Sequence, residues 1–406
     1  MQVNIRTPEL LSPAGDFEKL TMAVCYGADA VYLSGKEFGM RAEAASFDNE
    51  QLLKGIKFAH DKGVKVYITC NTLPREKEME RLPDYLSFLQ NAGADGLIIA
   101  DLGVLSLAKK YAPSIKCHIS TQFGVVNSTT ASYLFEQGAD TVVLARELSL
   151  EEICSIRVHT PAELRLEVFV HGAMCVSFSG RCLISNYLTA RDANRGQCAQ
   201  PCRWKYHLME ETRPGEFFEI TEDGGTFILN SNDLCMIEHL GELADAGIDS
   251  FKIEGRMKSA YYTAVVTNAY RHAIDAIGKD IPIDPVWIGE TEKVSHRPYC
   301  TGFYYGDPGQ HYGSSSYSQT ADVVAVVEKC DENGNAVLTQ RNRFSAGDTL
   351  ELMNPETKPV SFTAERITDL DGADIADTRH PMMQFRMKLP VSVPRYSIIR
   401  KPRSIS

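Results

Sequence analysis

Five cysteines are the residues of this sequence best suited to chemistry. Of eleven cysteines in the 406-residue chain, these five fall close together, with six, fifteen, three and thirty-two residues between successive members: Cys175, Cys182, Cys198, Cys202 and Cys235. Thiolates brought together by a loop bind soft metals. Zinc sites usually contain close Cys-x2-4-Cys pairs, whereas irregular spacing is typical of an iron–sulfur cluster held by cysteines from separate elements. The spacing favours a cluster and leaves zinc, or no metal, open.

Polar residues at the ends of apolar runs form a second group of candidates. His171 and Glu254 each follow such a run, and either side chain can move protons. His118 is a third catalytic candidate, with packing in the core as the alternative. Gln122 and Asp101, also at run ends, are candidates for binding substrate.

A substrate that carries carboxylates is best held by arginine, whose guanidinium binds a carboxylate through two hydrogen bonds. Structural pairing of these arginines with acidic neighbours is the alternative. The candidates are Arg41, Arg146, Arg191 and Arg256.

A repeating pattern of helix and strand positions these candidates. A Gly-x-Asp segment occurs four times, each time between an amphipathic stretch and a short apolar run. The glycines are Gly27, Gly93, Gly138 and Gly247. Glycine suits the left-handed end of a helix, and a continuous apolar run suits a parallel strand that is buried on both faces. Eight such runs are centred near residues 10, 32, 67, 98, 118, 143, 168 and 252. Eight βα units predict a TIM-like (β/α)8 barrel, with an open doubly wound sheet as the alternative.

The spacing of the runs divides the chain into domains. We predict a barrel over residues 1–280, a linker over 281–319, rich in Pro, Gly, Ser and Tyr, and a small all-β barrel over 320–406. About 80 residues separate the last two barrel runs, and the cysteines lie in this insertion, at about 171–235. Long insertions in compact domains tend to be functional, and this one follows the carboxyl end of a strand, where barrel enzymes build their sites.

Composition narrows the function classes. Apolar residues make up 44% of the chain, yet no run reaches the roughly 20 residues of a membrane helix. The amino terminus has no secretion-signal pattern, so we expect a cytoplasmic protein without a membrane partner. The net charge of −11 argues against nucleic-acid binding by the whole surface. A basic strip at the carboxyl end and the aromatic residues at 303–305 are local candidates for holding RNA, with a solvated strand face and linker packing as the alternatives.

Residues 167–185 resemble the signature of the peptidase U32 family, often labelled collagenase-like proteases. The fixed positions of that signature are all present: Glu167, Phe169, Gly172, Ala173, Met174, Cys175, Gly180, Cys182, Ile184 and Ser185. The resemblance extends over most of the chain, and the chain is most similar to the bacterial tRNA hydroxylation proteins. That subgroup converts the wobble uridine of certain tRNAs to 5-hydroxyuridine in a prephenate-dependent reaction, and related members hydroxylate their substrates without molecular oxygen.

The resemblance also implies a cofactor and partners. It implies a 4Fe-4S cluster on Cys175, Cys182, Cys198 and Cys235, with Cys202 as the alternative to Cys198. The implied partners are the anticodon region of tRNA and a small carboxylate co-substrate, and the oligomeric state is left open. The family label makes a peptidase the first alternative function, although the His-Glu-x-x-His motif of a metalloprotease is absent. A non-catalytic RNA-binding partner is the second alternative.

Overall fold

Eight parallel strands close into a barrel in the computed structural model, which describes residues 7–40, 46–175, 177–204, 208–209, 217–218, 231–309 and 317–403. The barrel strands are β1 (Glu9–Pro13), β2 (Ala30–Leu33), β3 (Lys65–Cys70), β4 (Gly96–Ile99), β5 (Lys116–Ile119), β6 (Thr141–Val143), β7 (Arg165–Ala173) and β11 (Ser250–Ile253). Each pairs with the next, and β11 pairs with both β7 and β1, which closes the ring. The predicted barrel is confirmed.

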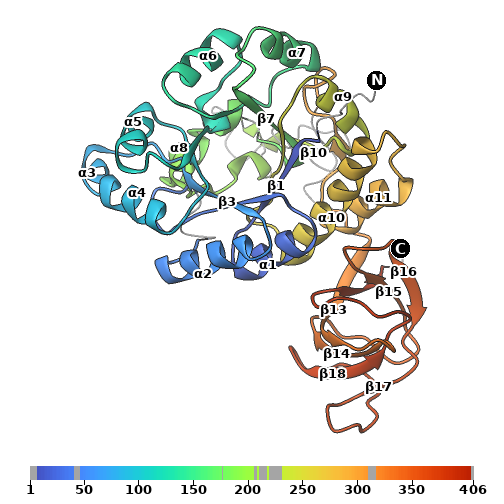
Figure 1. Cartoon of the computed structure of the whole chain (residues 1–406). Helices are drawn as coiled ribbons and strands as arrows, with labels where there is room; N and C mark the ends of the chain where they lie inside the picture. Colours follow the sequence, from blue (N-terminus) through green and yellow to red (C-terminus); the bar gives the residue numbers. More distant parts are fainter. Residues whose placement is uncertain are drawn as a thin grey trace.

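Helices surround the barrel (Figure 1). They are α1 (Phe17–Cys25), α2 (Asn49–His60), α3 (Glu76–Met79), α4 (Leu82–Asn91), α5 (Leu102–Tyr111), α6 (Ser128–Glu136), α7 (Leu150–Val158), α9 (Leu240–Asp245) and α10 (Ala260–Gly278). Short polar side chains start several of them. Asp48 and Ser149, for example, form capping boxes at the starts of α2 and α7, which satisfies backbone N–H groups that the helix leaves free.

The repeated Gly-x-Asp segment has a structural role in each unit. All four glycines have positive φ at helix ends, as the repeat predicts. Each aspartate accepts a hydrogen bond from a backbone N–H at the start of the neighbouring strand: Asp29 from Leu10 at 2.8 Å, Asp95 from Val66 at 2.7 Å, Asp140 from Cys117 and Asp249 from Leu166, both at 2.9 Å. The repeat therefore ties each barrel strand to its neighbour.

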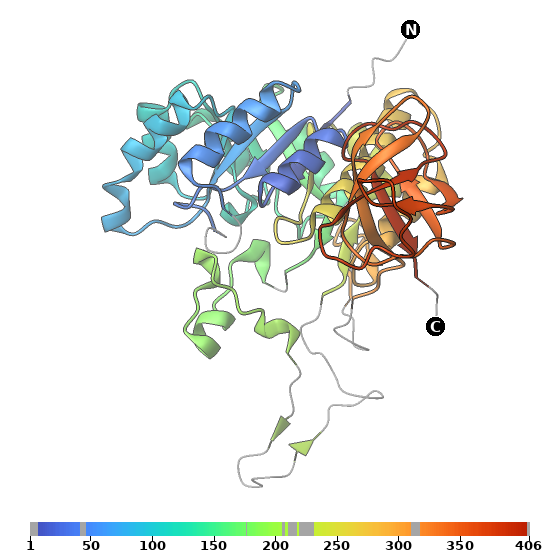
Figure 2. The ribbon, with the colours of Figure 1, turned by 90° about the horizontal axis from the view of Figure 1, so that it is seen from below.

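The cysteine-rich insertion leaves the barrel after β7. It contains the short helices η2 (Phe178–Gly180), α8 (Ile184–Thr189), η3 (Ala193–Arg195) and η4 (Pro201–Arg203), the paired strands β8 (Leu208–Met209) and β9 (Phe217–Phe218), and β10 (Asp233–Cys235). Figure 2 shows its described part, in green, projecting from the barrel. The chain returns through β10, which pairs antiparallel with the end of β7. Cys235 is the last residue of β10 and lies just before η5 (Ile237–His239) and α9.

Residues 281–319 contain more regular structure than a linker. They form α11 (Pro285–Glu290), η6 (Thr291–Lys293) and β12 (Tyr299–Cys300). β12 pairs with β10, so the chain leaving the barrel is held against the insertion. The Tyr304 side chain is buried, and its hydroxyl donates to the Phe169 carbonyl at 2.6 Å, so this aromatic packs against the barrel.

The carboxyl-terminal residues form a separate antiparallel half-barrel. Its strands are β13 (Ala321–Cys330), β14 (Asn335–Gln340), β15 (Thr349–Met353), β16 (Val360–Thr363), β17 (Ile367–Thr368), β18 (Gln384–Lys388) and β19 (Ile398–Pro402), in the order β16-β15-β19-β13-β14-β18-β17. Arg395, Lys401 and Arg403 pair with acidic residues of this domain. The carboxyl-terminal strip therefore has much of its charge engaged within the domain.

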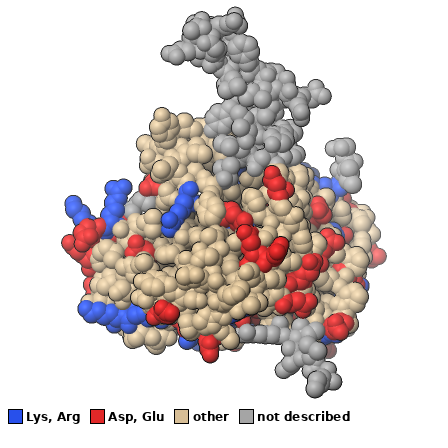
Figure 3. All heavy atoms as spheres, turned by 90° about the horizontal axis from the view of Figure 1, so that it is seen from above, with Lys and Arg blue, Asp and Glu red and all other residues tan. Residues whose placement is uncertain are grey.

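Surface charge follows the acidic composition. Asp and Glu side chains gather over part of the face drawn in Figure 3, which agrees with the net charge of −11. Among the described residues, no helix is both long and apolar enough to cross a membrane.

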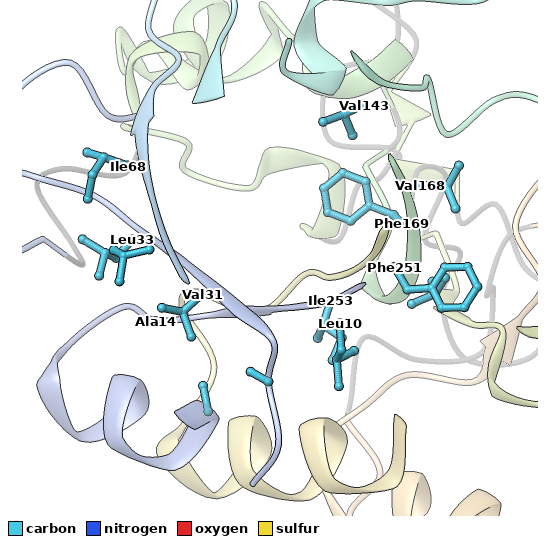
Figure 4. Packing of buried hydrophobic residues seen from close by; sticks show 14 of the residues in the cluster. Leu10, Ala14, Val31, Leu33, Ile68, Val143, Val168, Phe169, Phe251 and Ile253 are labelled. Atoms are coloured by element: carbon cyan, nitrogen blue, oxygen red, sulfur yellow. The ribbon is translucent and has the colours of Figure 1, made fainter. Parts of the chain in front are cut away.

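The main core lies between the barrel strands and the helices. Leu10, Val31, Ile68 and Phe251 are buried there, and Figure 4 shows how such side chains from neighbouring strands pack together. A smaller cluster fills part of the barrel interior with Leu11, Ala30, Tyr32, Tyr67 and Ile98. The strands are thus buried on both faces, as their continuous apolar runs predict.

Gly172 is required where β7 passes β11. Its φ is +111°, and a Cβ there would lie 2.3 Å from the Glu254 carbonyl oxygen. We expect Gly172→Ala to lower the free energy of unfolding by roughly 3 kcal/mol, measured by urea denaturation. Gly241→Ala in α9 is the matched control, because nothing lies within 4 Å of its added Cβ. The control should be neutral or gain up to about 1 kcal/mol, and equal stability of the two variants would contradict the argument.

Candidate active site

Three of the cysteine thiols lie near one another at the carboxyl end of the barrel. Cys175 follows β7 directly, and Cys198 and Cys202 flank the start of η4. Burial raises the pKa of the Cys202 thiol, Arg203 opposes this, and the neighbouring thiols of Cys175 and Cys198 raise it further. Cys182 is half-buried, and the Asn194 side chain holds its backbone N–H and C=O at 3.3 and 3.0 Å. All of these cysteines are free thiols.

Cys235 lies beside His171 and Tyr270. It pairs with His171 across β10 and β7, and its Sγ is 3.8 Å from the Tyr270 hydroxyl on α10. Burial raises the pKa of this thiol to about 11. In the part of the chain that the structure describes, no group of three or more His, Cys, Asp or Glu side chains is arranged to hold a metal ion.

The described residues fit a metal cluster by the type of their ligand atoms and not by their arrangement. Five free thiols at one end of the barrel are the donor set that a soft-metal cluster uses. Of the four predicted ligands, Cys235 has its Sγ beside the Tyr270 hydroxyl.

His171 is buried beside Cys235. Its Nδ1 lies 3.2 Å from the Tyr270 hydroxyl, which itself donates to the Val170 carbonyl at 2.8 Å. Burial lowers the pKa of His171 to about 3, so the ring is neutral at physiological pH. The Tyr270 hydroxyl therefore lies between His171 and Cys235, two of the candidate residues from the sequence.

The barrel interior holds a buried ion pair between Lys252 and Glu167, a signature position for which the sequence had indicated no role. Lys252 Nζ lies 2.7 Å from the Glu167 carboxylate and 4.9 Å from the Tyr32 ring centroid. The Tyr32 hydroxyl donates to the Ile253 carbonyl at 3.0 Å and lies 3.5 Å from the half-buried Glu254 carboxylate. The available signal was a charged residue inside each of two largely apolar strands, Glu167 in β7 and Lys252 in β11.

Arg146 and Gln122 present polar atoms with no partner among the described residues. Arg146 donates from Nη1 to the Ala173 carbonyl at 3.1 Å, and its guanidinium lies 5.1 Å from the Phe169 ring centroid, but its buried Nε has no acceptor. The buried Gln122 Oε1 likewise has no donor. Buried polar atoms are normally satisfied, so these two are available to a ligand.

The other predicted binding residues are dispersed. Arg256 is buried and donates from Nη1 to Thr69 Oγ1 at 3.0 Å. Asp101 caps α5 by accepting from the Val104 N–H at 3.1 Å. Arg191 is exposed just beyond α8, and Arg41 lies outside the described residues. Arg146, Arg191 and Arg256 therefore follow separate elements of the described structure.

A cavity of about 400 Å³ lies between the insertion and the barrel rim. Its lining includes Cys175, Phe178, Phe303, Glu147 and Asn232. Glu147 is held in place because Ser179 donates to its carboxylate from Oγ at 2.8 Å. The cavity therefore combines aromatic walls, a fixed carboxylate and one of the predicted metal ligands.

His118 lies inside the barrel rather than at this cavity. Its ring centroid is 4.3 Å from that of Tyr67, and burial lowers its pKa to about 3. Between pH 6.5 and 3 the unfolded chain therefore binds a proton at this site that the folded chain does not. The free energy of unfolding must fall as the pH falls through this window.

His118→Asn should remove this part of the acid sensitivity. From pH 6.5 to 5.0, the wild type should lose about 1.5 kcal/mol more than the variant in urea denaturation. The same substitution at the exposed His380 is the control. Parallel pH dependence of wild type and His118→Asn would show that His118 is protonated in the folded barrel.

Comparison with known proteins identifies the family. The model of peptidase family U32 matches residues 15–313, and that of the peptidase family U32 C-terminal domain matches residues 319–400. The chain belongs to peptidase family U32. The resemblance carried by residues 167–185 is thereby confirmed, and the two matches correspond to the barrel with its insertion and to the half-barrel.

Several U32 relatives have names that refer to RNA. The chain is 39% identical to "tRNA hydroxylation protein P1" of Bacillus subtilis over 98% of this chain and 96% of that protein. It is 36% identical to "tRNA hydroxylation protein P" of Escherichia coli over 90% of each chain. It is also 39% identical to "23S rRNA 5-hydroxycytidine C2501 synthase" of Escherichia coli over 73% of this chain and 45% of that protein.

Proposed function

We propose that this U32 chain is an enzyme that hydroxylates the wobble uridine of tRNA to 5-hydroxyuridine, in a prephenate-dependent reaction without molecular oxygen. The observation that carries the proposal is the similarity, over nine-tenths or more of this chain, to two proteins named for tRNA hydroxylation. A third relative is named for a product hydroxylated at the same ring position of cytidine.

The cavity beside Cys175 supports the proposal, because an enzyme that modifies a base must take it out of the stack into a pocket. Phe178 and Phe303 line that cavity and offer surfaces on which a base can stack. Replacing C5–H of uridine by C5–OH removes two electrons, so the reaction needs an electron acceptor. A 4Fe-4S cluster on Cys175, Cys182, Cys198 and Cys235 would supply one-electron chemistry when bound.

Two residues near the cavity suit a carboxylate co-substrate such as prephenate. Arg146 has a free buried Nε and precedes Glu147 of the cavity wall. Gln122 has a free Oε1 that can accept from a hydroxyl group. We assign Arg146 to a carboxylate and Gln122 to a hydroxyl of that molecule.

Glu254 is the proton acceptor that we assign among the three candidates. Its carboxylate is half-buried beside the Tyr32 hydroxyl at the barrel mouth. His118 and His171 are buried, and burial lowers the pKa of each to about 3, so each ring is too weak a base to take up a proton at neutral pH.

The family name keeps a peptidase as the alternative function. A serine or cysteine peptidase needs a base oriented toward its nucleophile. The His118 ring packs on Tyr67, and His171 Nδ1 faces the Tyr270 hydroxyl, so among the described residues neither ring is hydrogen-bonded to a serine or cysteine nucleophile. These contacts favour the hydroxylase.

Deletion of the gene tests the proposal. Loss of 5-hydroxyuridine from tRNA digests, measured by mass spectrometry, and its return with a wild-type copy is the expected result. Arg146→Gln should restore much less than wild type. Unchanged 5-hydroxyuridine in the deletion strain would overturn the proposal, leaving an RNA-binding partner if the purified protein still binds tRNA. Peptide cleavage that survives complete removal of iron would favour the peptidase.

A further inference from the structure

Large apolar side chains are unusually exposed on one segment, residues 177–204, which we term the rim segment. Tyr187 is 88% exposed, and four further large side chains of this segment are exposed: Phe178, Leu183, Leu188 and Trp204. Scattered exposed apolar residues are ordinary, but a concentration of them marks an interaction site. Much of the remaining aromatic content of the protein is buried, as for Tyr26, Phe251 and Tyr262.

The rim segment has internal contacts that keep these side chains outward. Ser185 Oγ accepts from the Ala199 N–H at 2.9 Å, and the Asn194 side chain holds the backbone of Cys182. α8 packs against η3 and η4, and η2 packs against η1 (Thr121–Phe123) at the barrel rim. The exposed residues thus belong to one small folded unit that projects from the barrel (Figure 2).

The charge of the rim segment is opposite to that of the whole chain. Residues 177–204 contain four arginines, no lysine and a single acid, Asp192, in a chain whose net charge is −11. The side chains of Arg181 and Arg191, which flank α8, are exposed. Arginine combines phosphate binding with stacking on flat rings, which suits it to nucleic acid. Aromatic rings interleaved with arginine are what proteins use to hold unpaired bases.

We propose that the rim segment binds the unpaired nucleotides of an RNA loop, with bases stacked on Tyr187 and Trp204 and phosphates held by Arg181 and Arg191. This rests on the proposed function, since it names the surface that presents RNA to the cavity. Phe178 connects the two, because it is exposed on the rim segment and also lines the cavity beside Cys175. The rim segment that would hold the loop therefore shares Phe178 with the cavity that would accept the flipped base.

Binding of a labelled anticodon stem-loop with uridine at the wobble position tests this with the full-length protein, by fluorescence anisotropy. Tyr187→Ala should weaken binding about tenfold, since stacking of one base is worth that much. Tyr187→Phe should bind like wild type, and Tyr187→Leu should be as weak as alanine, because leucine is apolar but has no flat ring. The double variant Arg181→Gln, Arg191→Gln should lower the salt slope by about two.

Tyr133→Ala is the matched control, because this tyrosine of α6 is also exposed but lies outside the rim segment. It should leave binding unchanged. The inference is overturned if Tyr187→Ala binds the stem-loop as tightly as wild type. It is also overturned if Tyr187→Leu binds the stem-loop as tightly as wild type, because an apolar side chain without a flat ring would then be sufficient. A third contrary result is that the rim-segment variants bind the stem-loop normally and lose only their binding to anionic lipid vesicles.

The same variants separate this inference from the proposed function. If a wild-type copy fails to restore 5-hydroxyuridine in the deletion strain, the proposed function is wrong regardless of RNA binding. If wild type and Tyr187→Ala restore it equally and bind the stem-loop equally, only the role of the rim segment is wrong.

Discussion

Cys175→Ser is expected to remove nearly all bound iron and to lower 5-hydroxyuridine formation at least about 100-fold. Removing a residue that only hydrogen-bonds to a metal ligand lowers metal affinity or activity about 10- to 100-fold. Cys175 is proposed as a ligand itself, so its removal should cost at least as much. It also lines the cavity that we assign to the base, so the position joins the metal and substrate sites. Iron and sulfide content and the visible absorption of anaerobically purified protein are the measurements.

Cys154→Ser is the matched control, because this cysteine is exposed on α7 and lies outside the insertion. It should retain full iron content. Retention of iron by Cys175→Ser would contradict the ligand assignment.

The other cysteines give the ligand set its sharpest test. Cys202 lies near Cys175 and Cys198, whereas Cys235 faces Tyr270. The proposed ligands predict iron loss in Cys198→Ser and Cys235→Ser and retention in Cys202→Ser. Iron loss in Cys202→Ser with retention in Cys198→Ser or Cys235→Ser would place Cys202 in the ligand set instead.

Arg400→Gln is expected to lower the free energy of unfolding by about 3–5 kcal/mol. Arg400 of β19 is fully buried, and its two terminal nitrogens each lie 2.7 Å from the Glu290 carboxylate on α11. Its Nε lies 2.9 Å from the Glu351 carboxylate on β15. Removing the guanidinium leaves buried carboxylate charge uncompensated, which is costly in this range.

Arg403→Gln provides the comparison, because its pair with Asp322 is solvent-exposed. The loss there should stay below about 1 kcal/mol. Urea denaturation followed by tryptophan fluorescence reports on the junction, since Trp287 is in α11. Because the Arg400–Glu290 pair joins β19 of the half-barrel to α11, Arg400→Gln should also separate the unfolding of the two domains. A loss similar to that of Arg403→Gln would show that Glu290 takes up a proton or reaches water instead.

Much of the barrel was predictable because its signals are local. Each Gly-x-Asp segment encodes a helix end and a hydrogen bond to the barrel strand that precedes it in the chain. A parallel strand buried on both faces must be apolar throughout. The segment 281–319 was harder, because its short strand β12 exists through pairing with β10, more than sixty residues earlier. The cysteines were identifiable as a group, but the direction of each thiol depends on where the insertion folds back.

The sequence by itself determined the eight-stranded barrel, the small all-β domain and the family, since periodicity and the 167–185 signature are properties of contiguous residues. Only the tertiary structure decided that Cys235 contacts Tyr270, that Lys252 pairs with Glu167 inside the barrel, and that Tyr187 and Trp204 stand in solvent. The two contacts join residues that are distant in the chain, and the exposure of Tyr187 and Trp204 depends on which segments fold against them. Their energies depend on burial and distance, which a local pattern does not contain.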